Sequence, residues 1–434
     1  MEEVNVLILG GLTHLARPLL TFLVNRSPDE KPRVAKIRVA DKHLLAGQTR
    51  TTYIDSETEA ALQDARVEYR QANLNTPATA SSVFKLEAGS VFDFVFDLTG
   101  EGILTTESPA NVLLERTTKL AGLLASEAKA NGARAYIRDT PPFWTSKPDE
   151  GAAKEGDVAK RSLPKDPRTY FYYEAERAVA NIDDLPVVLL RSAAVWGPNQ
   201  YYGPVSPRIA LGDVYAFLQE PMKVLWSPEM RLNTLHAHDW VSAAWSSALW
   251  ASSRDRAQGN AEAGERLPPL PIKEKTSAVD TEADHERCCP RAKTPVAPVM
   301  NLVDDDDTTT RKLLDVVSEL FGIETGFTNA AVNAWAKVNL SGVADDINEK
   351  HVEALDKMRK QQGEGTGEAG AEGRKPCPIE VYLPVQSLVQ RSIHLDGTKA
   401  RKVLGEWKSK QRLDKDSVEA VVKSFKDNGA WIRK

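Results

Sequence analysis

The sequence has few cysteines and no long apolar run. Only three cysteines occur in 434 residues: Cys288 and Cys289 are adjacent in a Pro-rich polar stretch, and Cys377 follows a second one. A disulfide framework is therefore excluded, and a reducing compartment, the cytoplasm, is expected. No segment approaches the ~20 apolar residues that cross a bilayer. The acidic start MEEVNVLILGG lacks the basic and apolar regions of a signal peptide.

The chain also has little net charge, because 56 basic and 61 acidic residues leave a formal charge of -5. Such a balance gives no electrostatic footprint for nucleic acid or for an anionic membrane, so a small-molecule partner is expected. Hydrophobic residues make up 41% of the chain and charged residues 27%, which is typical of a globular protein with a sizeable core. The length exceeds one typical domain and predicts two lobes.

Apolar runs of strand length alternate with runs of helical spacing. The first run, 4–9, ends at Gly10-Gly11, and residues 14–24 then recur apolar at helical spacing. Further strands are expected at 35–40, 90–98, 133–137, 185–191 and 300–303, and helices at 111–131, 172–182, 309–321 and 345–360. This alternation predicts an α/β fold, a Rossmann-like doubly wound parallel sheet with a smaller mixed C-terminal substrate lobe.

Composition suggests where the lobes divide. Residues 1–253 are expected to form the dinucleotide-binding domain, with parts of 190–250 shared with the substrate lobe. Residues 254–298 combine Pro, Gly, Ala and charges, which predicts a disordered surface insertion that folding does not need. Residues 299–434 would then be the substrate lobe, with a low-complexity loop at 361–376.

Gly10 and Gly11 stand at the first strand-to-helix turn. Glycine at such a turn lets backbone N–H groups approach a pyrophosphate at the start of the helix. Thr13 falls where a second close-approach glycine is usual, and Ala16 where a third would pack helix against strand. The alternative is a turn that only preserves the fold.

Asp41 ends the second expected strand, where an acidic residue accepts hydrogen bonds from the adenosine ribose and repels a 2′-phosphate. This position favours NAD as the cofactor, with NADP left open by the nearby Arg38 and Lys42. The alternative is a solvated turn aspartate.

Five segments carry a resemblance to a known family. They are LILGGLTHLA, FDFVFDLTG, LRSAAVWGPN, LNTLHAHDW and LDGTKARKVLG. Together they resemble the extended short-chain dehydrogenases/reductases, the epimerase/dehydratase group that acts largely on nucleotide sugars. The resemblance implies NAD(P) contacts at Gly10, Gly11, Thr13, His14, Leu15, Asp41, Leu98, Thr99, Gly100, Tyr173 and Arg177.

The family's chemistry rests on a Ser or Thr and a Tyr-x-x-x-Lys pair, in which lysine lowers the tyrosine pKa. By position the resemblance implies Thr140 and Tyr173 as catalytic residues, with Arg177 in place of the lysine. Arginine keeps a positive charge on the same helix face, although its planar fork differs from an ammonium. Tyr170, Phe171 and Tyr172 crowd the same segment, so the register is open and these aromatic residues could simply pack a helix.

No metal site is expected. His236 and His238 alternate before Asp239 without a third ligand, and Asp239 is interpreted as a helix N-cap. The acidic run 304–307 lacks calcium-loop spacing and suits a helix start.

Three functions remain open from the sequence: an NAD(P)-dependent oxidoreductase or epimerase/dehydratase, a non-catalytic dinucleotide-binding sensor or scaffold, and an interaction protein that has lost the nucleotide. A homodimer is compatible with each of them.

Overall fold

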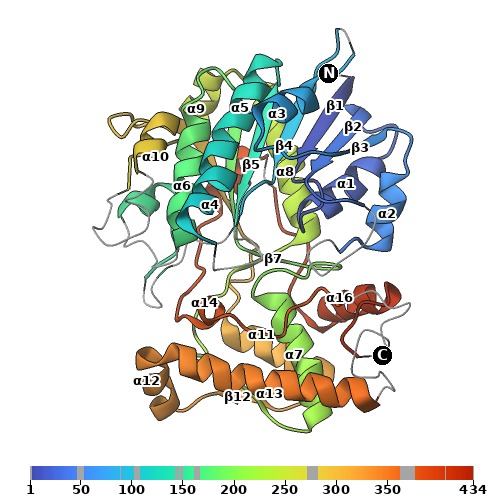
Figure 1. The fold of residues 1–434 in the computed structure, drawn as a ribbon, viewed down its shortest axis with the longest axis vertical. Coiled ribbons are helices and arrows are strands. Elements are labelled where there is room, and N and C mark those ends of the chain that lie inside the picture. The colour runs from blue at the N-terminus through green and yellow to red at the C-terminus, as the bar shows by residue number, and fades with distance from the viewer. Residues whose placement is uncertain are drawn as a thin grey trace.

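The computed structural model describes residues 2–45, 53–87, 89–101, 108–141, 146, 150–160, 167–270, 282–361, 377–405 and 407–433. They form two lobes along the long axis of the molecule, a sheet-based upper lobe and a mainly helical lower lobe (Figure 1). Within these ranges the structure contains no helix that is both long and apolar enough to cross a membrane.

The upper lobe is built on an eight-stranded sheet of order β10-β11-β6-β5-β4-β1-β2-β3. All neighbouring pairs are parallel except β10 with β11. The chain order reverses between β1 and β4, which is where open α/β sheets bind ligands, outside the carboxyl ends of the strands. The strands are β1 (Glu3–Leu9), β2 (Arg33–Asp41), β3 (Val67–Gln71), β4 (Phe94–Asp97), β5 (Ala135–Thr140), β6 (Val187–Ser192), β10 (Gly264–Arg266) and β11 (Val296–Leu302). The predicted Rossmann-like fold class is confirmed.

Helices cover both faces of this sheet, so strands such as β6 are buried on both sides. One face carries α1 (Ala16–Val24), α2 (Ser56–Leu62) and α8 (Ala237–Ser252). The other carries α3 (Pro77–Phe84), α4 (Ala110–Leu113), the π-helical η2 (Leu114–Lys119), α5 (Leu120–Ala130) and α6 (Pro167–Ala180). The helix expected at 111–131 is thus the continuous run α4–η2–α5.

The lower lobe packs helices around the segment that follows β6. It contains α7 (Val205–Leu218), α11 (Thr310–Phe321), α12 (Ala330–Val338), α13 (Leu340–Gln361), α14 (Val385–Leu388) and α16 (Lys415–Asp427), with the strand pair β8 (Met222–Val224) and β12 (Thr325–Phe327). Between the lobes lie the paired strands β7 (Ala194–Trp196) and β9 (Thr234–His236). Two further elements are the 3₁₀ helix η3 (Glu155–Lys160) and α15 (Thr398–Val403).

Helix α16 returns to the upper lobe. Asn428, just after the helix, accepts a 2.7 Å hydrogen bond from the Ser56 N–H, and Ser424 accepts a 2.9 Å bond from the Asn199 N–H. The end of the chain is thereby joined to the beginning of α2.

The structure corrects the expectation for residues 254–298. Their described part forms α9 (Arg256–Ala263), strand β10 of the main sheet and α10 (Glu282–Cys288), and it buries Leu267 and Leu270. The polar composition was misleading because a short capped helix and a three-residue edge strand need few apolar residues. Strand β11 also belongs to the main sheet, so the upper lobe extends past the expected boundary at 299. Residues 362–376 of the expected low-complexity loop lie outside the described residues.

Asp239 is not the N-cap of α8. His236 occupies that position, and its ring nitrogen accepts a 3.3 Å bond from the His238 N–H. The Asp239 carboxylate instead accepts hydrogen bonds from the hydroxyl of Ser409 and from the N–H groups of Lys410 and Gln411. Its role is to hold the C-terminal segment. The acidic run behaves similarly, since Asp304 accepts from the Thr234 hydroxyl while Thr309 caps α11.

Candidate functional site

The glycine turn packs tightly against two strands. Gly10 has a φ of +74°, and a Cβ there would lie 2.8 Å from the carbonyl oxygen of Leu98. A Cβ on Gly11 would lie 2.1 Å from Cγ1 of Val39. Both glycine N–H groups donate to the carbonyl oxygen of Ala40, at 2.9 and 3.0 Å. Glycine is therefore required here by the packing of the turn on β2 and β4, whatever ligand it meets.

Asp41 lies at the predicted sheet edge, and its carboxylate is bonded within the protein. One oxygen accepts the Leu12 N–H at 3.0 Å, and the other accepts the His43 N–H at 3.0 Å and contacts the His43 ring nitrogen at 2.7 Å. Burial alone would raise the pKa of Asp41, but these hydrogen bonds outweigh it and hold the pKa below its usual value. The ionised side chain thus ties the glycine turn to the segment after β2.

The start of α1 has the features of an anion site. Its N-cap residue, Leu15, provides no side-chain hydrogen bond to the first turn. In that turn the Arg17 N–H donates to the Thr13 carbonyl at 3.3 Å and Pro18 has no N–H, so the Ala16 N–H is the first-turn donor left for a ligand among the described residues. The hydroxyl of Thr13 is buried, and no hydrogen-bond partner for it occurs among the described residues. An uncapped helix start beside a buried hydroxyl suits an anionic oxygen. These two features fit a diphosphate.

His14 and Arg17 surround the same turn. Burial, with the nearby Arg17 cation, lowers the pKa of His14 to about 3, so its ring is neutral; it lies 4.8 Å from the Tyr202 ring. Arg17 is buried between the Tyr53 and Tyr201 rings and forms a 2.8 Å ion pair with Asp55. The charge of Arg17 is therefore already compensated.

Leu98, Thr99 and Gly100 follow β4 at the same edge. Thr99 donates through its N–H and its hydroxyl to Asp97, at 3.0 and 2.6 Å. Asp97 is fully buried, with an ion pair to Arg138 and a 2.7 Å bond from the Tyr136 hydroxyl. This polar cluster fixes the edge beneath Gly100.

Helix α6 brings Tyr172 to this edge, rather than Tyr173. A Cβ on Gly100 would lie 2.1 Å from the Tyr172 hydroxyl oxygen, so the phenol reaches the backbone just beyond β4. Burial raises the pKa of Tyr172 well above its usual value, although Arg138 and Arg168 oppose the shift. The phenol is therefore protonated at neutral pH.

The predicted orientation of Tyr173 and Arg177 was wrong. The Tyr173 hydroxyl donates to the Pro268 carbonyl at 2.7 Å. Arg177 pairs with Glu174 at 2.6 Å and donates to the carbonyls of Leu267, Pro290 and Lys293. One residue along a helix turns a side chain by about 100°. Both groups thus anchor residues 267–268 and 290–293 on the outer side of α6, away from Gly100.

The residue four positions after Tyr172 is Glu176, and α6 contains no lysine. Glu176 forms a buried ion pair with Arg191 of β6 at 2.6 Å. No cation at that position can lower the Tyr172 pKa, because the position carries a carboxylate. The family's Tyr-x-x-x-Lys pair is absent from the face of α6 that meets the sheet edge.

Thr140 lies at the expected place. It ends β5, in the register that pairs Asp97 of β4 with Arg138. Thr140, the last residue of β5, and Gly100, three residues after the end of β4, therefore lie at the carboxyl ends of adjacent strands. The Thr140 hydroxyl is fully buried and has no hydrogen-bond partner among the described residues.

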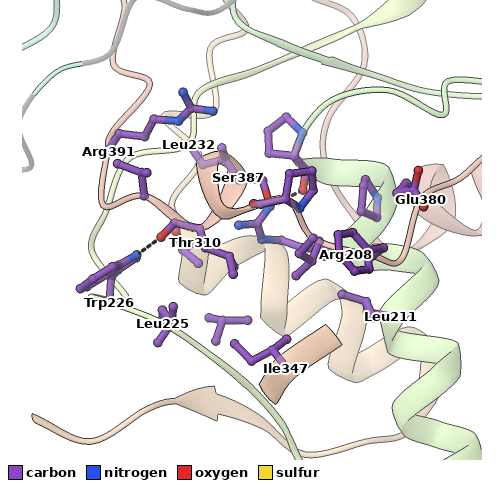
Figure 2. Close-up of a pocket in the computed structure, with 18 of the residues that line it drawn as sticks. Arg208, Leu211, Leu225, Trp226, Leu232, Thr310, Ile347, Glu380, Ser387 and Arg391 are labelled. Carbon is purple, nitrogen blue, oxygen red and sulfur yellow. Dashed lines mark hydrogen bonds between the residues drawn. The ribbon is translucent and has the colours of Figure 1, made fainter. Parts of the chain in front are cut away.

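A large cavity, absent from the sequence predictions, lies in the lower lobe beside this edge. Its volume is about 580 Å³, and its walls come from residues 201–215, 222–232, α12, α13 and 378–393. Arg168, one turn before Tyr172 on α6, also lines it. Figure 2 shows the Arg208 side chain among Leu211, Leu225, Trp226 and Ile347. The sequence signal was weak because these residues are scattered over almost 200 positions.

The amino-acid sequence matches no protein-family model and no curated protein. Solved structures do resemble the chain. The Bordetella bronchiseptica enzyme WbmG in complex with NAD is 14% identical, with a TM-score of 0.57 over 99% of this chain and 96% of that one. The UDP-glucose 4-epimerase of Thermotoga maritima with UDP-glucose is 15% identical, with a TM-score of 0.57 over 98% and 99%.

DesIV of Streptomyces venezuelae, a dTDP-glucose 4,6-dehydratase with NAD and TYD bound, is 12% identical, with a TM-score of 0.60 over 98% of both chains. At such identities the likeness concerns the fold. The chain has the two-lobed, Rossmann-like fold of these epimerases and dehydratases over nearly its full length.

Proposed function

We propose that the chain binds NAD at the carboxyl edge of the sheet and acts as an oxidoreductase or an epimerase/dehydratase. Its substrate would carry a hydroxyl or carbonyl group, as a sugar nucleotide does. The observation that carries this proposal is the uncapped start of α1 beside the buried Thr13 hydroxyl, on a fold for which solved relatives hold NAD. NADP stays possible, because the preference for NAD rests on Asp41 alone.

The cofactor, when bound, would supply reversible hydride transfer. The chain's own residues would do the rest. Gly10 to Leu15 and the first turn of α1 would hold the diphosphate, and Asp41 would accept from the ribose. Leu98, Thr99 and Gly100 would border the nicotinamide half.

Proton transfer would fall to Tyr172 with Thr140. A neutral phenol can donate a proton or a hydrogen bond to a substrate oxygen, and the Thr140 hydroxyl has free hydrogen-bonding capacity for the same oxygen. Arg168 lines the adjoining cavity four residues before Tyr172 and would favour an anionic substrate group.

A second function is favoured by Glu176. With a carboxylate in place of the family lysine, already paired with Arg191, the helix supplies no cation four residues after the phenol, and the charges of Arg138 and Arg168 do not outweigh burial in setting the Tyr172 pKa. A dinucleotide-binding sensor or scaffold without turnover would have this arrangement. Both candidates bind the cofactor, and they differ only in chemistry.

Calorimetric titration with NAD and NADP tests the shared step. We expect NAD to bind more tightly, and Thr13→Val to weaken binding about tenfold through the loss of one hydrogen bond. Thr21→Val, within α1, is the control. Absence of binding by either dinucleotide would refute both candidates.

Turnover of a panel of sugar nucleotides and other hydroxyl substrates separates the two candidates. For an enzyme, Tyr172→Phe should lower kcat by roughly 10²–10⁴-fold and leave NAD binding intact. Tyr173→Phe, on the outer side of α6, is the matched control and should retain activity. The opposite result would restore the assignment of Tyr173 and Arg177. NAD binding without turnover of any substrate supports the sensor or scaffold.

We also propose a cytoplasmic location, supported by the three free cysteines, and leave a homodimer as the assembly to test by sedimentation.

A further inference from the structure

The cavity of the lower lobe has mainly apolar walls. Trp226, Leu225 and Met230 pack with residues of α12, α13 and α14 in one apolar cluster, and Leu211 and Ile393 extend the lining. The Trp226 indole N–H donates to the Leu388 carbonyl at 2.7 Å, so the polar atom of this ring is already satisfied. A volume of about 580 Å³ is in the range of small-molecule sites.

The apolar lining continues to the surface. Of the eight large hydrophobic residues that are exposed in the described part of the chain, Val332, Trp335, Tyr382 and Val389 all line this cavity. The Trp335 side chain is 56% exposed on α12. Apolar side chains gathered at the mouth of a cavity indicate an apolar ligand, because exposing them to water costs free energy.

The same cavity has a cationic side. Arg208 and Arg391 both line it, together with the carboxylates of Asp346 and Glu380, and the charge of Arg391 acts on Arg208. Arg208 donates to the Pro204 carbonyl, and the described residues place no carboxylate in an ion pair with it. Burial, aided by Arg391, lowers the pKa of Arg208 to about 10, so it remains charged at neutral pH. An anionic group on the ligand would offset the electrostatic repulsion between the Arg208 and Arg391 guanidinium groups.

We propose that the cavity binds an amphipathic anion, whose apolar body lies against Trp226 and Trp335 and whose carboxylate or phosphate group meets Arg208 and Arg391. The inference deepens the proposed function, on which it rests for treating this cavity as the substrate site. The oxygen to be transformed would lie toward Arg168 and Tyr172.

The test is calorimetric titration of the full chain with dodecanoate and dodecyl phosphate below their micelle concentrations, with dodecanol below its solubility limit, and with UDP. We expect both anions to bind at least tenfold more tightly than dodecanol. The stronger of the two identifies the anionic group. Equal binding of dodecanol, or binding of UDP alone, would overturn the proposal.

Three variants locate the site. Arg208→Met should weaken the two anions at least tenfold and leave dodecanol unchanged, whereas Trp335→Ala should weaken all three ligands. Arg287→Met, which removes an exposed cation on α10, is the control for overall charge. Each variant is checked for an unchanged melting temperature, and Arg391→Met replaces Arg208→Met if the latter fails to fold. An affinity for the two anions that neither Arg208→Met nor Arg391→Met changes would contradict the proposal.

Two further outcomes are decisive. Sedimentation that shows a dimer broken by Trp335→Ala, without ligand binding, would mean that the apolar mouth pairs two copies of the chain. Titration of the same sample with NAD separates the two proposals. Binding of dodecanoate or dodecyl phosphate without NAD binding contradicts only the proposed function, and NAD binding without binding of either anion contradicts only this inference.

Discussion

The sheet edge and the lower-lobe cavity differ in how many of their polar groups already form hydrogen bonds or ion pairs within the protein. At the edge, the N–H groups of Gly10, Gly11 and Leu12 and the Asp41 carboxylate are bonded within the chain. In the cavity, Arg208 is charged without a carboxylate partner among the described residues, and Trp335 is exposed. The polar groups at the edge therefore mainly stabilise the fold, while the cavity has side chains that can still bind a ligand. Motifs that identify a fold therefore locate the edge better than they identify the substrate.

Among substitutions at the sheet edge and the cavity, Arg191→Met is expected to change the free energy of unfolding most. The substitution leaves the Glu176 carboxylate buried and unpaired behind the edge, which should lower the free energy of unfolding by roughly 3–5 kcal/mol. Urea unfolding followed by tryptophan fluorescence measures it. The double variant Arg191→Met/Glu176→Gln should recover part of the loss. A decrease in unfolding free energy below about 1 kcal/mol for Arg191→Met alone would mean that water reaches the Glu176 carboxylate.

Gly10→Ala tests whether the glycine turn is required by packing. The positive φ and the approach to the Leu98 carbonyl should together cost about 2–4 kcal/mol. Gly322→Ala is the matched control, because Gly322 has a similar φ of +65° with no atom within 4 Å of the added Cβ. It should cost only about 1–2 kcal/mol. Equal costs would show that backbone strain alone, without the packing contact, sets the requirement.

His351, in the cavity wall, should make the free energy of unfolding depend on pH. Burial lowers the pKa of His351 to about 4, so the unfolded chain, with a pKa near 6.5, takes up the proton first. The stabilising contribution is complete above pH 6.5 and is lost as the pH falls toward 4. Between pH 7 and pH 5 it amounts to about 2 kcal/mol.

His351→Gln should therefore flatten the decline in unfolding free energy over this range. The comparison with wild type is needed because burial raises the pKa of Asp139 and Asp304 to about 6, which adds stability as the pH falls from 6 to 4. Identical pH profiles for the two proteins would show that His351 is protonated equally in both states.

The smallest effect is expected for Asp41→Asn. The amide still accepts one hydrogen bond, so losing the charge-assisted bonds to Leu12 and His43 should cost about 1 kcal/mol. Thermal unfolding against the exposed control Asp29→Asn measures it. A cost equal to that of the control would indicate that the turn does not need the carboxylate.

The sequence predicted the sheet, because buried parallel strands are continuous apolar runs such as Val187 to Leu190. It failed for β10 and α9, whose composition is polar. The turn and Asp41 were located correctly, since they stand directly at strand ends. The tyrosine that the structure brings to the sheet edge, Tyr172, lies one position before the predicted Tyr173, because four aromatic residues in a row leave the helix face undefined until Glu176 is paired with Arg191. The cavity could not be predicted, since its residues meet only through tertiary packing.

The way α16 is joined to α2 affects how the protein is synthesised. Ser56 and Asn428, linked by a hydrogen bond, are 372 positions apart, and β11 enters the sheet only after residue 295. A nascent chain that has left the ribosome as far as β6 therefore lacks its neighbouring strand β11, and that edge of the sheet remains unpaired until much more of the chain has emerged. Such late closure slows folding and exposes strand edges to other chains. Chaperone dependence during translation is the expected consequence of a sheet completed so late.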